Sequence, residues 1–169
     1  MKTLLSTAAV CLALAACSST GPTKTAAEPT PPRATTPPAQ PSPVAETEAQ
    51  KMSRLLTQLS KKSVYFDYDK YDLKPQYQDV VQQNAAFMKE FGKDAVVLEG
   101  NTDERGSKEY NLALGQKRAE TVRQALKLMG IPDSRIEAIS YGEEKPRASC
   151  KAEKCWQENR RVDFDHKSK

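Results

Sequence analysis

Residues 96–123 place a short apolar run, a polar loop and a long helical pattern in succession, and this order restricts the fold more than any other feature. Residues 96–98 are β-branched or aliphatic and favour a strand. The loop at 100–106 carries Asp103, and Arg118 follows fifteen residues later on the predicted helix. Such a pair suits a ligand with both an ammonium and a carboxylate group. The alternative is that Asp103 only caps the turn and Arg118 faces solvent.

Hydrophobic periodicity extends this unit into a complete small domain at 63–166, preceded at 51–62 by a short helix or linker. The predicted elements are a helix over 46–59, a strand over 64–67, a helix from Pro75 to Gly92, a strand over 95–99, a helix over 107–129, and strands over 136–141 and 161–165. After the first short helix the order is β-α-β-α-β-β. This order predicts an α+β fold, a two-layer α/β sandwich with helices on one face of a four-stranded mixed sheet.

The N-terminus has the pattern of an export signal. Lys2 precedes an apolar run over residues 4–16 that is too short for a mature membrane span. The run ends in Leu-Ala-Ala-Cys, which resembles the lipobox of bacterial lipoproteins. This resemblance predicts a signal peptide at 1–16 and lipidation of Cys17, and Ser18 after the cysteine favours the outer membrane. The alternative is an ordinary signal peptide with a chance cysteine.

Residues 17–50 predict a lipidated N-terminus followed by a disordered tether. Eight of the eleven prolines fall here, mixed with Thr, Ala and Ser, and no hydrophobic periodicity is present. In a polyproline-like conformation such a segment reaches on the order of 100 Å, and much less if coiled. The composition therefore suits a domain held away from a membrane.

Cys150 and Cys155 lie five positions apart, and in an oxidising periplasm they favour a loop-closing disulfide. Zinc is the rival interpretation, but two cysteines without nearby histidines supply too few ligands. The acidic run at 67–72 superficially suggests a calcium loop, yet Asp72 and Gln78 stand where an EF-hand needs Gly and Glu. No metal site and no cofactor are therefore expected.

The formal net charge of +4 is modest, and basic residues alternate with acidic ones along the chain. Such mixing is typical of a solvated surface rather than of a stripe that follows a phosphate backbone. Nucleic acid is therefore not an expected partner.

Several spaced motifs together resemble the OmpA-like peptidoglycan-binding domain family, over about Val64 to Phe164. The motifs are Asn101-Thr102-Asp103-Glu104-Arg105-Gly106-Ser107, Tyr110-Asn111, Leu114, Arg118-Ala119, Val122, Tyr141-Gly142-Glu143, Pro146 and Asn159-Arg160-Arg161. Within the family, the strand at 64–69 and the Asp-Glu-Arg-Gly loop are most similar to the peptidoglycan-associated lipoproteins of Gram-negative bacteria.

The resemblance implies a non-enzymatic protein that binds the diaminopimelate of the peptidoglycan stem peptide. Asp103 is then expected to take the ammonium of that group and Arg118 its carboxylate. Backbone amides near Phe66 and Asp67 and polar groups of Thr102, Arg105 and Asn111 would complete the pocket. The resemblance further implies a link from outer membrane to cell wall, a β-propeller partner of the Tol system, and a role in cell division.

Two departures and two rival functions accompany this resemblance. Asn101 stands where relatives often carry histidine, and the cysteine pair in the loop at 147–156 is not a feature associated with them. Residues 159–161 could complete the pocket or hold the last strand.

A peptidoglycan hydrolase would need only two carboxylates, such as Asp67 and Asp69, but no nucleophile elbow and no histidine near the pocket support it. An assembly or motility lipoprotein with the same domain is the other rival.

Overall fold

The computed structural model describes residues 46–168. Its helices are α1 (Glu48–Leu59), α2 (Gln78–Glu90), α3 (Lys108–Leu128) and α4 (Glu153–Asn159), with 3-10 turns at Pro75–Tyr77 and Asp133–Arg135. Its strands are β1 (Val64–Tyr65), β2 (Val96–Asn101), β3 (Ile136–Gly142) and β4 (Arg161–His166). The predicted signal peptide, Cys17 and most of the predicted tether lie outside the described residues. Over 46–168, no helix has the length and apolar composition needed to cross a membrane.

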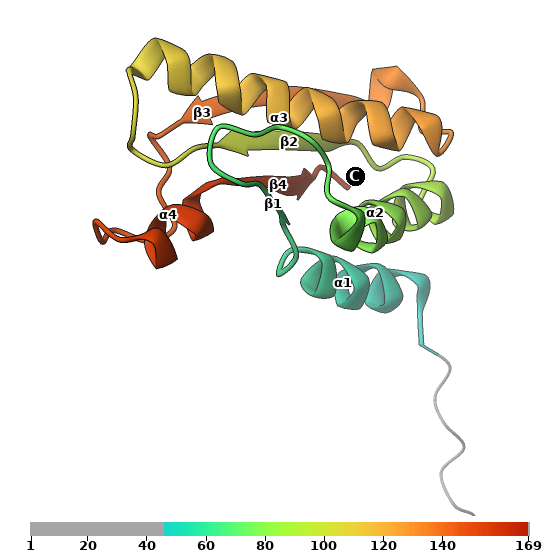
Figure 1. The fold of residues 1–169 in the computed structure, drawn as a ribbon. Coiled ribbons are helices and arrows are strands. Elements are labelled where there is room, and N and C mark those ends of the chain that lie inside the picture. The colour runs from blue at the N-terminus through green and yellow to red at the C-terminus, as the bar shows by residue number, and fades with distance from the viewer. Residues whose placement is uncertain (1–45, 169) are drawn as a thin grey trace, which may run out of the picture. The chain divides into compact units, whose positions relative to one another are not determined.

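The strands form one mixed sheet in the order β1-β4-β2-β3 (Figure 1). β2 pairs in parallel with β3, and α3 provides the crossover that a parallel pair requires. β4 lies antiparallel to both β1 and β2, with Leu98 opposite Phe164. The predicted α+β class with a four-stranded mixed sheet is confirmed.

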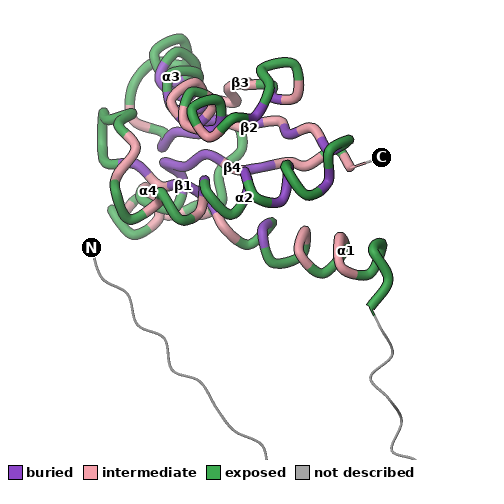
Figure 2. Tube along the Cα trace, turned by 90° about the vertical axis from the view of Figure 1, so that its right-hand side faces the viewer, coloured by how far each residue is buried: buried purple, intermediate pink, exposed green. Residues whose placement is uncertain are grey.

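One face of the sheet is apolar and is covered by α2 and α3, as the buried segments in Figure 2 show. Successive strand residues point to opposite faces, so alternate positions of β2 and β4 reach the core. The inward set consists of Val96, Leu98, Val162 and Phe164 from the strands, Val81, Ala85 and Met88 from α2, and Ala119, Val122 and Leu126 from α3. Burying each of the larger aliphatic side chains contributes about 1.5–3 kcal/mol, which makes this layer the main source of stability.

Three elements differ from the sequence expectation. α1 begins at Glu48, inside the segment assigned to the tether, because Thr47 and Gln50 form a capping box there. β1 is only two residues long, shorter than the predicted strand over 64–67. The helix α4 stands in the segment expected to be a loop, and its seven residues are too few for a periodic signal.

The backbones of β2 and α3 approach one another closely at two glycines. A Cβ atom placed on Gly100 would lie 1.9 Å from the carbonyl oxygen of Gly115, and one on Gly115 would lie 2.3 Å from Ser140 Oγ. Gly100 belongs to the strand rather than to the polar loop that the sequence suggested, so the loop starts at Thr102. This contact fixes how far α3 stands from the end of β2.

We predict that Gly100→Ala lowers the free energy of unfolding by about 3 kcal/mol or more, because the added methyl group meets backbone atoms that cannot move without shifting α3. Urea denaturation followed by circular dichroism measures the change. Gly92→Ala is the matched control, since its added Cβ has no atom within 4 Å. Equal stability of the two variants would contradict this packing argument.

Candidate functional site

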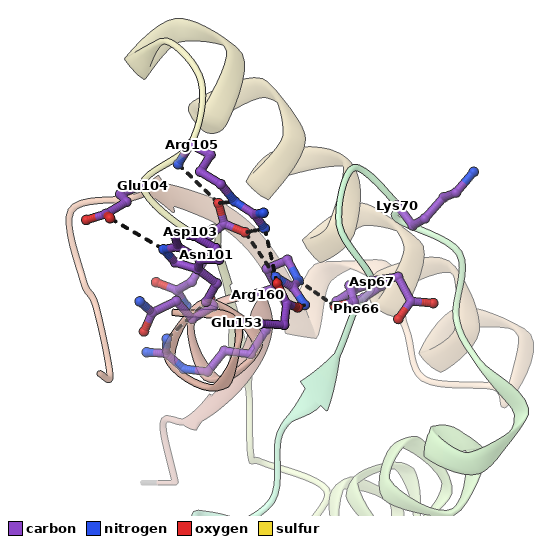
Figure 3. Close-up of polar contacts among 12 residues, drawn as sticks. Phe66, Asp67, Lys70, Asn101, Asp103, Glu104, Arg105, Glu153 and Arg160 are labelled. Atoms are coloured by element: carbon purple, nitrogen blue, oxygen red, sulfur yellow. Dashed lines mark hydrogen bonds and ion pairs between the residues drawn. The ribbon is translucent and has the colours of Figure 1, made fainter. Parts of the chain in front are cut away.

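Four segments meet at one end of the sheet and form a small polar site (Figure 3). They are the loop between β2 and α3, the N-terminal half of α3, the loop that follows β1, and the junction of α4 with β4. The hollow between them is lined by Tyr68, Asp69, Thr102, Asp103, Arg105, Tyr110, Asn111, Leu114, Arg118 and Arg160. Five of the seven predicted binding residues are in this set; Phe66 and Asp67 are not.

Asp103 is the central acid of the site and is only 4% exposed. Its Oδ1 accepts a hydrogen bond from Arg105 Nε at 2.9 Å, and its Oδ2 accepts from Arg105 Nη2 at 2.7 Å. Arg160, from the start of β4, donates from Nη1 to Oδ2 at 3.1 Å. A carboxylate held by two guanidinium groups is strongly oriented.

The charge of Asp103 is stabilised by this arrangement. Burial alone would raise the pKa of the carboxyl group, but the hydrogen bonds from the Arg105 side chain and backbone and from Arg160 outweigh it. The pKa of Asp103 is therefore held below its usual range, and the group is an anion near neutral pH.

Arg118 is fully buried and joins two of the segments that form the site. Its Nε donates to the Lys70 carbonyl at 2.8 Å, its Nη2 to the Asp67 carbonyl at 3.0 Å and its Nη1 to the Asn101 carbonyl at 3.0 Å. The alternative that Arg118 lies on a solvated face is wrong. Burial, followed by the repulsion of Arg160, lowers the pKa of Arg118 to about 10, which still leaves it charged at neutral pH.

Two buried side-chain oxygens beside Asp103 have no hydrogen-bond partner within residues 46–168. They are Thr102 Oγ1 and Asn101 Oδ1, on residues that are 3% and 0% exposed. Thr102 lines the hollow, whereas the Asn101 amide donates to the Glu99 carbonyl. A buried hydroxyl without a partner is costly, so Thr102 Oγ1 at the edge of the hollow is available to a water molecule or to a ligand group.

Phe66 and Asp67 do not line the hollow, but their carbonyl groups hold two of the arginines that do. The Phe66 carbonyl accepts a hydrogen bond from Arg160 Nε. The centre of the Phe66 ring lies 5.3 Å from the guanidinium carbon of Arg118. The Phe66 amide, expected to face a ligand, donates to the Arg160 carbonyl at 2.9 Å. The Asp67 side chain is exposed and pairs with Lys74, while its carbonyl holds Arg118.

Residues 159–161 divide between the two roles that the sequence left open. Arg160 reaches the pocket, where it bonds Asp103. Asn159 instead holds the preceding loop, because its side chain bonds the backbone of Arg147 and Ala148. Arg161 lies outside the hollow and bonds Asp163.

Sequence reasoning missed Tyr68, Asp69, Tyr110 and Leu114 as lining residues. Tyr68 and Asp69 lie in the acidic run that was considered as a calcium loop and, for Asp69, as a glycosidase carboxylate, but not as part of a ligand-binding pocket. Tyr110 donates its hydroxyl hydrogen to Asp69 across the hollow, and Asp69 adopts a positive φ of 55° that places it there. The signal was the alternation of tyrosine and aspartate at 67–72, which is typical of a polar recognition loop.

The predicted disulfide is present and closes the turn before α4. The Sγ atoms of Cys150 and Cys155 are 2.00 Å apart. α4 carries Glu153, which bonds Arg160, and Trp156, whose ring lies 4.2 Å from the guanidinium carbon of Arg105. The cysteine loop therefore belongs to the wall of the site.

We predict that Asp103→Asn lowers the free energy of unfolding by about 2–3 kcal/mol at pH 7, because buried Arg160 loses a charged partner. A depressed pKa in the folded state means that the contribution of Asp103 is complete above the ordinary carboxyl pKa of about 3.9. It is lost as the pH falls through the folded value, so the stabilities of the two proteins begin to converge below about pH 4.

Chemical denaturation of parent and variant between pH 3 and 7 measures this convergence. Asp133→Asn is the control, since that carboxylate forms an ion pair with Arg123 on the exposed side of α3. A stability difference that stays constant across the range would contradict the assignment.

Comparison with known proteins places this geometry in a family. Residues 65–160 match the OmpA family. A peptidoglycan-associated lipoprotein of Pseudomonas putida is 48% identical over 100 residues, covering 59% of this chain and 60% of that protein. One of Pasteurella multocida is 43% identical over 100 residues, covering 59% and 67%. The chain thus spans about 60% of the length of the first of these relatives.

Solved structures agree with the fold. The peptidoglycan-associated lipoprotein from Burkholderia pseudomallei is 51% identical, with a TM-score of 0.61 over 62% of this chain and 89% of that one. The C-terminal domain of Helicobacter pylori MotB has a TM-score of 0.59 over 64% and 85%; at 17% identity it supports the fold alone. Since the family match covers more than half of the sequence, this chain belongs to the OmpA family.

Proposed function

We propose that the site around Asp103 and Arg118 binds peptidoglycan non-covalently, through the diaminopimelate of its stem peptide. The observation that carries this proposal is that the buried carboxylate of Asp103 lines the same hollow as the buried guanidinium groups of Arg118 and Arg160. Diaminopimelate ends in an ammonium and a carboxylate on one carbon, so it needs an acid and a base a few ångströms apart. The names of the relatives, which are peptidoglycan-associated lipoproteins, support the same ligand class.

Arg118 retains donors for an anionic group. A guanidinium has five N–H bonds, and backbone carbonyls take three of those of Arg118. One N–H remains on each terminal nitrogen, and such a pair fits a carboxylate in two-point fashion. The unpartnered Thr102 hydroxyl offers one further donor or acceptor at the same hollow.

The site favours binding over catalysis. A glycosidase that hydrolyses the wall would need a carboxylic acid that is protonated near neutral pH. Asp103 has the opposite character, because Arg105 and Arg160 lower its pKa. We therefore propose a binding module without enzymatic activity.

For the whole chain we propose an outer-membrane lipoprotein that is anchored through lipidated Cys17, with residues 17–47 as the tether and the folded domain in the periplasm. In this arrangement the protein links the outer membrane to the wall. We further propose that it acts in the Tol system, with a β-propeller partner, in envelope integrity and cell division. The alternative is an assembly or motility lipoprotein that keeps wall binding but lacks that partner.

We predict that Thr102→Val weakens binding to diaminopimelate-type peptidoglycan by about tenfold, because the ligand loses a hydrogen bond inside a desolvated site. The free energy of unfolding should stay unchanged or rise by about 1 kcal/mol, since the hydroxyl has no partner in the folded protein. Co-sedimentation of the full chain with purified peptidoglycan measures binding, and thermal unfolding measures stability.

Thr121→Val is the matched control, because the Thr121 hydroxyl donates to the Lys117 carbonyl on the exposed side of α3. The proposal fails if the parent protein does not pellet with the wall. The role of the Thr102 hydroxyl in ligand binding is contradicted if Thr102→Val and Thr121→Val pellet to the same extent.

We predict that Cys17→Ser moves the protein from the membrane fraction to the soluble fraction of disrupted cells, because the acylation site is lost. Immunoblotting of both fractions measures the shift. The same replacement at Cys11, inside the predicted signal peptide, is the control and should leave the protein with the membranes. Membrane retention of Cys17→Ser would rule out the lipid anchor.

A further inference from the structure

We propose that Arg105 is an internal competitor that occupies the ammonium-binding side of Asp103 and must leave before the ligand binds. This inference rests on the proposed function, because it assigns Arg105 a role in that same site. It replaces the expectation that Arg105 is one more polar contact to the ligand. Without a ligand, the Arg105 guanidinium occupies the position beside Asp103, and ligand binding replaces it with the ligand ammonium.

The first observation is how fully Arg105 satisfies Asp103. Its Nε and Nη2 bond the two carboxylate oxygens at 2.9 and 2.7 Å, which is the fork geometry that a ligand cation would have to replace (Figure 3). Arg160 holds Oδ2 as well, at 3.1 Å. Both oxygens of the carboxylate therefore already carry donors.

The second observation is that the hollow has no room for a ligand while Arg105 lies in it. Its free volume is about 10 Å³, roughly what one water molecule requires. An amino acid end group with its ammonium and carboxylate is several times larger. Of the three arginines that line the hollow, Arg105 is the one that can move, since its side chain is 30% exposed whereas Arg118 and Arg160 are buried.

The third observation is that two aromatic rings, those of Tyr68 and Trp156, hold the Arg105 guanidinium in place. Its guanidinium carbon lies 4.1 Å from the centre of the Tyr68 ring and 4.2 Å from that of Trp156, so the cation is stacked between two aromatic faces. The two rings come from different segments, the loop after β1 and helix α4. The Cys150–Cys155 disulfide fixes the start of α4, which carries Trp156.

The fourth observation is a second acid that receives Arg105 when it leaves Asp103. Glu153 Oε2 lies 3.8 Å from Arg105 Nη2, and its side chain is 59% exposed. After the exchange the ligand ammonium pairs with Asp103, and Arg105 pairs with Glu153. Glu153 also accepts a hydrogen bond from Arg160 Nη2 through its Oε1, so Oε2 is the oxygen that faces Arg105.

This competition has a direct consequence for affinity. A ligand binds only the fraction of molecules in which Arg105 has left the carboxylate, so its apparent affinity is reduced by that fraction. Removing the competitor should therefore strengthen binding, whereas removing a true ligand contact should weaken it. The two roles of Arg105 predict effects of opposite sign.

The test measures binding of a soluble stem tripeptide that ends in meso-diaminopimelate to the full chain, by isothermal titration calorimetry. We expect Arg105→Ala to bind about 3- to 30-fold more tightly than the parent, the range given by one ion pair and two stacking contacts. Arg105→Gln removes the charge but keeps a polar side chain with three carbons. It should also tighten binding, which shows that the gain in Arg105→Ala does not come from a loosened loop. Arg123→Ala removes an arginine from an exposed ion pair on α3 and should leave affinity unchanged.

Trp156 supplies an independent readout, because it is the only tryptophan of the chain. Displacement of Arg105 from its ring should change the fluorescence of the parent on ligand binding, and this change should be absent in Arg105→Ala. Trp156→Leu removes one of the two aromatic rings that stack on Arg105, so it should also tighten ligand binding, by less than Arg105→Ala. Thermal unfolding checks that each variant is folded.

The outcomes separate the two proposals. A parent that binds, with folded Arg105→Ala and Arg105→Gln variants that bind equally or more weakly, overturns the competitor role and leaves the proposed function standing. A parent that does not bind the tripeptide or the wall overturns both. Tighter binding of both Arg105 variants, with no change in Arg123→Ala, supports the exchange.

Discussion

The buried guanidinium of Arg118 is the interaction on which the site depends. It binds the carbonyl groups of two loop residues after β1 and of the last residue of β2, and these segments are far apart in the sequence. That cation extends the hold on the loop after β1 beyond the two paired residues of β1 and the bonds of Phe66 with Arg160. A buried charge is tolerated here because each of its nitrogens has a backbone acceptor. One side chain thus ties the loop after β1 to the sheet and also lines the site proposed to bind a ligand.

The sequence allowed the fold class to be predicted because its signals were local and periodic. The stripes of α2 and α3 and the apolar positions of β2 and β4 each repeat within one element. Helix α4 was missed for the opposite reason, since seven residues around a disulfide carry no period. The predicted helix over 46–59 agrees with α1 to within two residues, but the end assigned to the tether at residue 50 was too late, because a capping box starts α1 at Glu48.

Most residues of the site could be predicted from the sequence, but the hydrogen-bond partners of these residues could not. Asp103 and Arg118 both line the hollow, yet each is bonded to groups that no spacing rule names: two other arginines in one case and three backbone carbonyls in the other. Arg105 shows the difference most clearly. Its type and position were expected at the pocket, but whether it faces the ligand or occupies the ligand's place depends on Tyr68 and Trp156, which come from two other segments.

The path of the chain from α1 into the site also has a mechanical meaning. Leu59 anchors the end of α1 against the core, and β1 begins five residues later at Val64. The next residues carry the carbonyls of Asp67 and Lys70 that hold Arg118. A force applied along the chain before Glu48 would therefore be borne first by Leu59 and then by the β1–β4 pair. If it exceeded both, it would reach the loop that positions Arg118, so that tension on the N-terminal side would loosen the grip on the ligand before the central sheet yields.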